Sequence, residues 1–256
     1  IYESMINYTG AKPVPINMLE NKDFSINPEK ILSLINENTR LLILNNPNNP
    51  TGAFTEKNKI DELAEGLKKF PNVAILSDEI YCRQIFDGKK MPSFFDYPDL
   101  YDRLIVLDGW SKAYSMTGWR LGWMVIPDNL IRTAECLAQN FFVSPPTLSQ
   151  LAAVSIFNCF EELNANVDRY ARNRNILITE LPKAGFENIA PPDGAFYLYA
   201  DVSSITSDSE TFCAKLLANT GVALTPGIDF ASRNGRKFIR FSYAGATADR
   251  VEARER

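Results

Sequence analysis

LLILNNPNNPTG, residues 41–52, is an apolar run that ends in asparagine, proline and glycine, which predicts a buried strand followed by a tight loop. The same pattern recurs in VAILSDEIY at 73–81 and in LIVLDGWSK at 104–112. A helix is predicted between the first two strands, with Thr55 as its candidate N-cap and apolar residues at one-face spacing. Strands that are apolar on both faces and alternate with helices favour an α/β fold, with a mainly parallel sheet covered by helices on both faces.

The pattern changes further along the chain. A long helical stretch is predicted from about Pro146 to Leu181, with a break near Asn164. Beyond it, short strands are predicted at residues 195–199, 222–224 and 238–241, and a helix is predicted at 209–219. We therefore predict a large domain at residues 1–170 and a smaller C-terminal α+β domain at residues 171–256. The chain starts without Met and stops within a helical charge pattern, so we expect each domain to be incomplete at its outer end.

The composition excludes several classes of protein. The 256 residues carry a net charge of −4 and contain no dense Lys/Arg tract, which argues against a nucleic-acid partner. No apolar run approaches the roughly 20 residues that cross a bilayer, and the first residues lack a signal-peptide layout. We therefore expect a cytoplasmic protein without a membrane partner.

Histidine is absent from the chain, and the four cysteines are far apart. Without histidine, a Ser-His-Asp or Cys-His mechanism is excluded within these residues, and no metal site or disulfide framework is indicated. Chemistry near neutral pH must therefore rely on Lys, Tyr, Asp, Glu or a cofactor.

Ligands of open α/β sheets bind outside the carboxyl ends of the strands. The residues just after the three predicted strands include Asn49, Asp78, Tyr81 and Lys112. Taken singly, each has an ordinary alternative: a turn asparagine, a cap carboxylate, a half-buried aromatic residue and a surface lysine. Together they supply an amide, a carboxylate, a phenol and an amine at one edge of the sheet.

Four motifs occur in a fixed order along the chain: NNPNNPTG at 45–52, SDEIY at 77–81, SKAYSMTGWRLGW at 111–123 and RFSYA at 240–244. In this order they resemble the class I aminotransferases of pyridoxal 5'-phosphate (PLP) fold type I, over essentially the whole chain. The resemblance implies a PLP-dependent transaminase of amino-acid metabolism or biosynthesis. Such an enzyme moves an amino group between an L-amino acid, here aspartate or a broad range, and a 2-oxo acid by a ping-pong route.

The resemblance also implies roles for individual residues. Lys112 would bind PLP covalently and move the substrate's Cα proton, which requires a lowered amine pKa. Asp78 would pair with the pyridine nitrogen, and Tyr81 and Asn49 would bind the phenolic oxygen. Asn49–Pro50 is also a candidate cis peptide bond.

Three further residues match anion-binding positions of the family. Arg120 matches the phosphate arginine, whose planar guanidinium gives a two-point contact. Ser111 would add a hydroxyl to the phosphate, although relatives more often use a serine three residues before the lysine, where this chain has Gly109. Arg240 matches the arginine that binds the substrate α-carboxylate beside Asn49, although an ordinary edge-strand arginine is the alternative.

The chain also departs from the family. The glycine-rich phosphate turn, the ring that stacks on the pyridine and a tyrosine from the partner subunit would all lie upstream of Ile1. The family's active sites lie between subunits, so we expect a homodimer. Two other functions stay open: a PLP lyase of the same fold, and the aminotransferase-like sensing domain of a transcription regulator.

Overall fold

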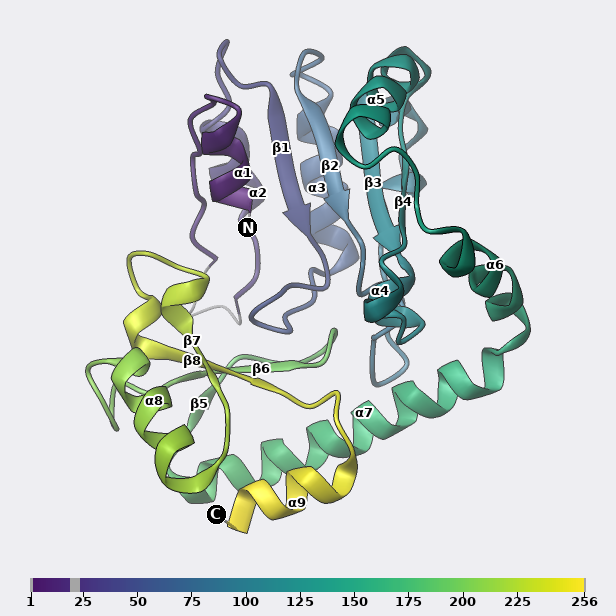
Figure 1. Ribbon diagram of the computed structural model, residues 1–256. Helices are drawn as coiled ribbons and strands as arrows, with labels where there is room; N and C mark the ends of the chain where they lie inside the picture. The colour runs from purple at the N-terminus through teal and green to yellow at the C-terminus, as the bar shows by residue number, and fades with distance from the viewer. Residues whose placement is uncertain (1, 19–23, 256) are drawn as a thin grey trace.

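The computed structural model describes residues 2–18 and 24–255. Its first sheet has the order β1-β2-β3-β4 and consists of β1 (Leu41–Asn45), β2 (Ala74–Asp78), β3 (Leu104–Gly109) and β4 (Gly122–Val125) (Figure 1). The first three strands are parallel, and β4 runs antiparallel to β3. The mainly parallel sheet is as predicted, whereas β4 is a strand that the sequence analysis did not predict.

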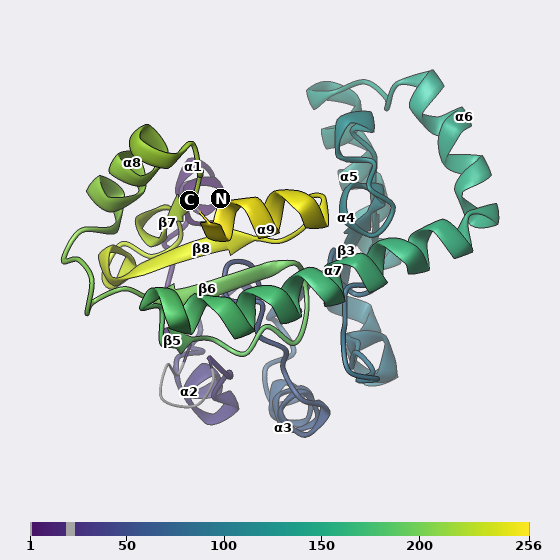
Figure 2. The ribbon, with the colours of Figure 1, turned by 90° about the horizontal axis from the view of Figure 1, so that it is seen from below.

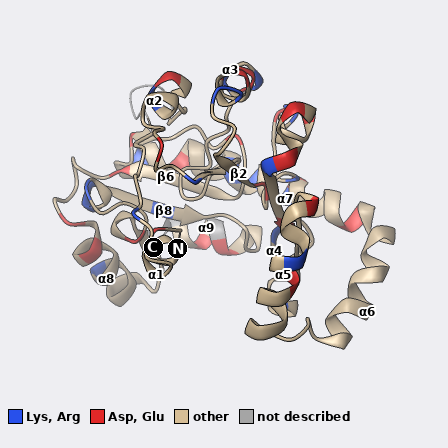
Figure 3. Cartoon of the chain, turned by 90° about the horizontal axis from the view of Figure 1, so that it is seen from above, with Lys and Arg blue, Asp and Glu red and all other residues tan. Residues whose placement is uncertain are grey.

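Helices lie on both sides of this sheet. Figures 2 and 3 show α2 (Pro28–Ser33) and α3 (Lys57–Leu67) on one side, and α1 (Tyr2–Tyr8) and α5 (Asp128–Phe141) on the other. The helices α2 and α3 bury a core against β1, β2 and β3. Neither α1 nor α5 has a buried residue among those described. Helices therefore lie on both faces as predicted, but among the described residues only α2 and α3 bury a core against the sheet.

The buried stripe of α3 is the one that the periodicity predicted: Ile60, Leu63, Ala64 and Leu67. Its N-cap is Glu56, which makes no side-chain cap hydrogen bond, so the prediction of Thr55 as the cap was wrong. The Thr55 amide instead donates to Oδ1 of Asn46 at 2.9 Å, which ties Thr55 to the loop before the helix.

A second sheet is antiparallel throughout and has the order β5-β6-β8-β7. Its strands are β5 (Asn188–Ile189), β6 (Tyr197–Asp201), β7 (Thr225–Pro226) and β8 (Phe238–Ser242), accompanied by α8 (Ser209–Thr220) and α9 (Thr247–Glu255). The strand predicted at 222–224 was wrong: these residues connect α8, whose C-cap is Gly221, to β7. Pairing with β8 begins only at Thr225, and residues 221–224 before it belong to no helix, strand or turn.

The long helical stretch is divided into α6 (Thr147–Ser155) and α7 (Phe160–Glu180). The break is a 3-10 turn at Ile156–Asn158, which comes before the expected position near Asn164, and Asn164 itself lies inside α7. In Figures 1 and 2, α7 runs from α6 to the second sheet. The domain boundary at residue 170 falls inside α7 and stays a prediction.

The second core joins segments from both parts of the chain. Tyr81 and Phe86, which follow β2, pack with Tyr170 of α7 and with Tyr197 and Phe241 of the second sheet. The remaining short helices are α4 (Trp110–Ala113) and 3-10 turns at 94–96, 98–103, 117–119, 181–184, 227–229 and 235–237. Within the described part of the chain, none of the helices combines the length and the apolar character that crossing a bilayer requires.

Candidate active site

The carboxyl ends of β1, β2 and β3 meet at one edge of the first sheet. Asn45, the last residue of β1, is in register with Asp78, the last residue of β2. On β3, Gly109 lies opposite Gly122 of β4, and a Cβ atom on Gly109 would lie 3.0 Å from the Gly122 Cα atom. Because both residues are glycine, the strands approach closely just before α4, which carries Lys112.

The loop after β1 connects the two sheets. Its peptide bonds Asn46–Pro47 and Asn49–Pro50 are both cis, and the second of these was predicted. Gly52 has φ +70°, and a Cβ atom there would lie 2.5 Å from the Tyr197 carbonyl oxygen. The Gly194 amide donates to the Gly52 carbonyl at 2.9 Å. The loop therefore lies against the start of β6 and brings Asn49 to the second sheet.

Arg240 meets Asn49 at this junction. One guanidinium nitrogen donates to Oδ1 of Asn49 at 2.8 Å, and another donates to Oγ1 of Thr225 at 3.2 Å. The ring centroids of Tyr197 and Phe230 lie 4.3 Å and 4.6 Å from the guanidinium carbon. The Nε atom is buried and has no hydrogen-bond partner among the described residues. Arg240 is thus held by polar and aromatic contacts while part of its donor capacity stays unused.

Lys112 lies near two guanidinium groups. Burial lowers the pKa of its amine, and the positive charges of Arg240 and Arg120 lower that pKa further. Its Nζ atom is 5.9 Å from the ring centroid of Phe196. No carboxylate of the residues that the structure describes forms an ion pair with this amine. The surroundings therefore favour a neutral amine more than those of a surface lysine do.

Asp78 accepts two hydrogen bonds, one to each carboxylate oxygen. The Ile80 amide donates to Oδ1 at 3.2 Å, and the hydroxyl of Tyr2 on α1 donates to Oδ2. Burial raises the pKa of Tyr2, and the Asp78 charge raises it further, so the phenol keeps its proton at neutral pH. These contacts fix the plane of the carboxylate at the end of β2.

Tyr81 is buried, with 3% of its surface exposed. Its hydroxyl oxygen lies 3.0 Å from that of Tyr197, and either group can be the donor. Burial raises the pKa of Tyr81, and Tyr197 raises it further, whereas Arg240 acts in the opposite direction. Tyr81 therefore stays protonated and links the end of β2 to β6.

Ser111 and Arg120 lie on the segment that joins β3 to β4. The Thr117 hydroxyl donates to the Ser111 carbonyl at 2.8 Å, and a guanidinium nitrogen of Arg120 donates to the Thr117 carbonyl at 3.0 Å. Arg120 has φ +56° and ψ +45°, a left-handed conformation that costs a residue with a Cβ atom about 1 kcal/mol or more. The side chain of Arg120 is exposed, yet its positive charge lowers the pKa of the Lys112 amine.

The structure brings most of the predicted residues together through contacts or charge. Asn49 contacts Arg240, and the charges of Arg240 and Arg120 both act on Lys112. The charge of Asp78 raises the pKa of Tyr81, and the charge of Arg240 lowers it. Ser111 lies beside Lys112 in α4, and its carbonyl accepts a hydrogen bond from the Thr117 hydroxyl.

Sequence reasoning missed Tyr2, Tyr197, Thr225 and Phe230. Tyr197 lies in the strand predicted at 195–199, but nothing local indicated a contact with Arg240. The contact between Tyr2 and Asp78 spans 76 residues and belongs to no motif, so no sequence signal could have found it.

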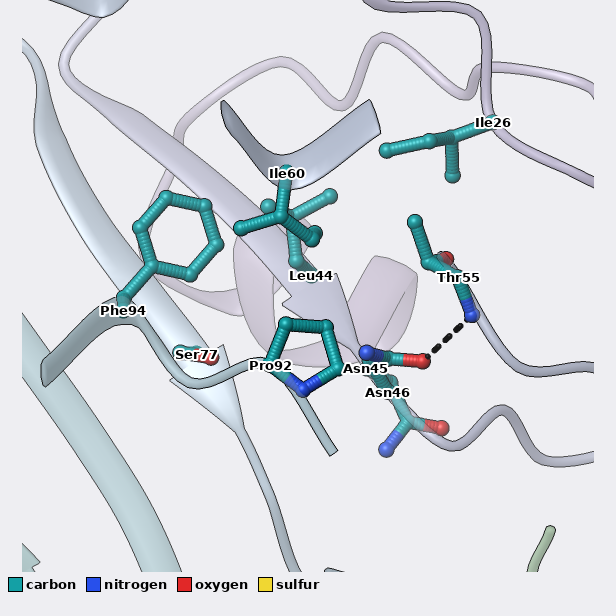
Figure 4. Close-up of a pocket in the computed structure, with 9 residues that line it drawn as sticks. All are labelled: Ile26, Leu44, Asn45, Asn46, Thr55, Ile60, Ser77, Pro92 and Phe94. Atoms are coloured by element: carbon teal, nitrogen blue, oxygen red, sulfur yellow. Dashed lines mark hydrogen bonds between the residues drawn. The ribbon is translucent and has the colours of Figure 1, made fainter. Parts of the chain in front are cut away.

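A small cavity lies beside the ends of β1 and β2 (Figure 4). Its volume is about 20 Å³, and its lining combines apolar side chains with polar residues: Ile26, Leu44, Asn45, Asn46, Thr55, Ile60, Ser77, Pro92 and Phe94. None of the predicted site residues lines it. The space accommodates about one water molecule and is too small for a cofactor.

Comparisons with known proteins agree with the motifs. The family model described as "Aminotransferase class I and II" matches residues 1–254. The chain is 39% identical over 257 residues to a valine–pyruvate aminotransferase of Mycobacterium tuberculosis, covering 100% of this chain and 65% of that protein. It is 34% identical over 249 residues to an aspartate aminotransferase of Sulfolobus acidocaldarius, covering 95% of this chain and 62% of that protein.

A solved structure of an aminotransferase from Mycobacterium tuberculosis matches with a TM-score of 0.91 and 39% identity, covering 99% of this chain and 65% of that one. The fold is therefore the type I fold of PLP enzymes, as predicted. The chain spans about 65% of the length of the valine–pyruvate aminotransferase and about 62% of that of the aspartate aminotransferase.

Proposed function

The chain belongs to the family of class I and II aminotransferases, and we propose that it transfers an amino group between an L-amino acid and a 2-oxo acid with PLP as cofactor. The observation that carries the proposal is the environment of Lys112. Its half-buried amine has no carboxylate partner among the described residues and lies within the electrostatic reach of two arginines. A fully exposed lysine lacks the burial and the nearby guanidinium groups that lower the pKa of this amine.

The residues at the strand ends fit the chemistry of PLP. When bound, PLP supplies an aldehyde that takes up the amino group and a ring that withdraws electrons from the substrate. The chain offers an amine for the aldehyde (Lys112), a carboxylate for the ring nitrogen (Asp78) and a guanidinium for the phosphate (Arg120). Each terminal nitrogen of Arg240 donates one hydrogen bond and carries a second N–H, which matches a second anion, the substrate α-carboxylate.

Lys112 is the catalytic residue of this proposal. Its lowered amine pKa leaves a larger neutral fraction at neutral pH, so the Nζ atom can accept the proton of the substrate Cα and return it at another carbon. Both arginines that lower this pKa are also anion-binding groups. Neutralisation of Arg120 and Arg240 by bound anions therefore makes the amine more basic as the ligands arrive.

Asp78 holds the protonated ring nitrogen. At a separation of about 4 Å and an effective dielectric constant of about 20, such an ion pair contributes about 4 kcal/mol, which keeps the ring protonated at neutral pH. Its two oxygens already accept from Tyr2 and Ile80, and each oxygen has a further lone pair for the ring N–H. The carboxylate can thus receive the cofactor without losing the contacts that orient it.

Asn49 and Tyr81 bind the phenolic oxygen of the cofactor. The Oδ1 atom of Asn49 accepts from Arg240, which leaves the amide N–H groups for the cofactor. Asn49 therefore serves both ligands, because the same side chain orients the arginine that binds the substrate. Arg120 binds the phosphate, and the Ser111 hydroxyl adds a hydrogen bond to it.

The substrate is an α-amino acid, which Arg240 recognises through its carboxylate. Two relatives are named for aspartate and for valine and pyruvate, which supports our proposal of aspartate or a broad range of amino acids. A homodimer and a cytoplasmic location are part of the proposal as well. The homodimer rests on the family, whose active sites lie between subunits.

Reduction with borohydride tests the proposal directly. We expect purified protein mixed with PLP to gain a visible absorbance band, and reduction to fix the cofactor on the peptide that contains Lys112, read by mass spectrometry. Lys112→Ala should show neither signal. The control is Lys183→Ala, since that lysine is 65% exposed and pairs with Glu180. Label on other lysines with none on Lys112 contradicts the proposal.

A product assay distinguishes transfer from elimination. With an amino acid alone, an aminotransferase forms one equivalent of 2-oxo acid and releases no ammonia, whereas a lyase of the same fold releases ammonia with every turnover. Sustained release of ammonia would show that the chain catalyses a lyase reaction and would contradict the proposed transfer.

A further inference from the structure

Tyr197 has two separate contacts with the proposed site, and sequence reasoning gave it no role. It is the first residue of β6 and only 6% exposed. Its hydroxyl meets that of Tyr81 at 3.0 Å, while its ring centroid lies 4.3 Å from the guanidinium carbon of Arg240. One side chain therefore contacts both a residue that binds the cofactor and the residue that binds the substrate.

The direction of the hydrogen bond between the two phenols matters for Tyr81. A phenol has one proton to donate and two lone pairs to accept with. If Tyr81 donated to Tyr197, its only proton would be used, and it could not donate to the cofactor oxygen. If Tyr197 donates instead, the Tyr81 proton stays free for the cofactor, and accepting a hydrogen bond makes Tyr81 a stronger donor.

The position of Arg240 favours Tyr197 as the donor. A cation over the face of an aromatic ring is attracted to its electrons and withdraws them from the hydroxyl. The guanidinium carbon lies over the ring of Tyr197, and its contacts with Asn49 and Thr225 keep it there. The more polarised of the two hydroxyls is therefore that of Tyr197.

We propose that Tyr197 is a positioning residue with two functions: its hydroxyl donates to Tyr81 and frees the Tyr81 proton for the cofactor, and its ring supports the guanidinium that binds the substrate carboxylate. The inference rests on the proposed function and adds a residue and a hydrogen-bond direction to it.

Two variants separate the two functions. Tyr197→Phe removes the hydroxyl and keeps the ring, whereas Tyr197→Leu removes both. Tyr243→Phe is the control, since that tyrosine is fully buried and its hydroxyl has no hydrogen-bond partner among the described residues. Circular dichroism checks that each variant folds, and Tyr197→Met replaces the leucine variant if that one does not.

The hydroxyl is tested by a pH titration of the absorbance of bound PLP. We expect Tyr197→Phe to raise the apparent pKa of this absorbance change by roughly 0.3–1 pH unit, because a weaker Tyr81 donor stabilises the anionic cofactor oxygen less. Tyr243→Phe should titrate like the wild type. A wild-type titration curve in Tyr197→Phe overturns the role of the hydroxyl.

The ring is tested without PLP, by calorimetric binding of succinate, an unreactive dicarboxylate. We expect Tyr197→Phe to bind within about twofold of the wild type and Tyr197→Leu to bind about fivefold or more weakly, as loss of a partly buried cation–π contact implies. Equal affinity in Tyr197→Leu and the wild type overturns the role of the ring. By contrast, a wild-type chain that gains no absorbance band with PLP contradicts the proposed function itself.

Discussion

Arg240 is the residue whose chemistry is hardest to replace. Its guanidinium reaches Asn49 and Thr225 at once and lies against two rings, which a lysine ammonium cannot reproduce. We expect Arg240→Lys to weaken succinate binding by roughly 10- to 100-fold, as the loss of a charge-assisted two-point contact implies. Arg236→Lys is the matched control, since Arg236 is 55% exposed and pairs with Asp208. Similar succinate affinities in Arg240→Lys and Arg236→Lys would contradict the assignment of Arg240 to the substrate site.

Cys82 illustrates how the residues around the site suppress a reactive group. Burial raises the pKa of its thiol to about 12, and the charges of Asp108 and Glu79 contribute to this rise. Because alkylation requires the thiolate, which forms only as the pH rises towards this pKa, we expect iodoacetamide at pH 8 to modify folded Cys82 roughly 100-fold or more slowly than glutathione. Peptide mass spectrometry measures the rate. In urea the difference should vanish, and a fast reaction in the folded chain would contradict the assigned environment.

The loop after β1 is the element that brings the two halves of the site together. Gly52 has a positive φ, and a Cβ atom there would lie 2.5 Å from a carbonyl oxygen of β6, so Gly52→Ala strains the backbone and pushes the loop away. Gly88 has the same φ of +70°, but a Cβ atom there would have no neighbour within 4 Å. Gly88→Ala therefore strains the backbone without causing a steric clash. We expect Gly52→Ala to lower the free energy of unfolding by roughly 1–3 kcal/mol more than Gly88→Ala does, measured by urea denaturation. Equal losses would mean that the loop tolerates separation from β6.

The same substitution also reports on the site. Displacing the loop moves Asn49 away from Arg240, so Gly52→Ala should weaken succinate binding as well, while Gly88→Ala should leave it unchanged. A stable Gly52→Ala variant with normal affinity would contradict the view that the loop positions Arg240 through Asn49.

At the scale of the whole molecule, residues 122–155, which include β4, α5 and α6, expose many large apolar side chains. All four residues of β4 are exposed, and α6 contains no charged residue and is drawn almost entirely in tan in Figure 3. Large apolar side chains of this segment are 64–80% exposed: Phe141, Phe142, Val143, Leu148, Leu151 and Val154. A monomeric protein rarely exposes so many neighbouring apolar residues.

We therefore expect the 256-residue chain to bind a hydrophobic dye and to self-associate. Replacing Phe141, Phe142 and Leu148 by serine should reduce both the dye fluorescence and the sedimentation coefficient. Serine at Ile205 and Leu217, which are 40% and 50% exposed but isolated from this segment in the sequence, should change neither. Unchanged association in the triple variant would show that these exposed apolar residues are not its cause.

Local sequence patterns were enough to predict the elements that carry the proposed site residues. Apolar runs closed by turn residues are local patterns, so they located β1, β2 and β3 and the polar residues at or just after each strand end, including Asp78 and Lys112. The periodicity of α3 predicted its buried stripe for the same reason. Boundaries were less well predicted at Thr55, near Asn164 and at 222–224, where contacts with the rest of the fold decide where an element starts or ends.

Which of these residues meet depends on the packing of segments that are far apart in the chain. Asn49 and Arg240 are 191 residues apart, and Tyr81 and Tyr197 are 116 apart, so no spacing or periodicity relates them. Their contacts depend on the packing of the loop after β1 against β6, which is set by close backbone approach at Gly52 and Gly194. The sequence specifies which groups are available through local patterns, and the packing of distant segments decides which of them share a site.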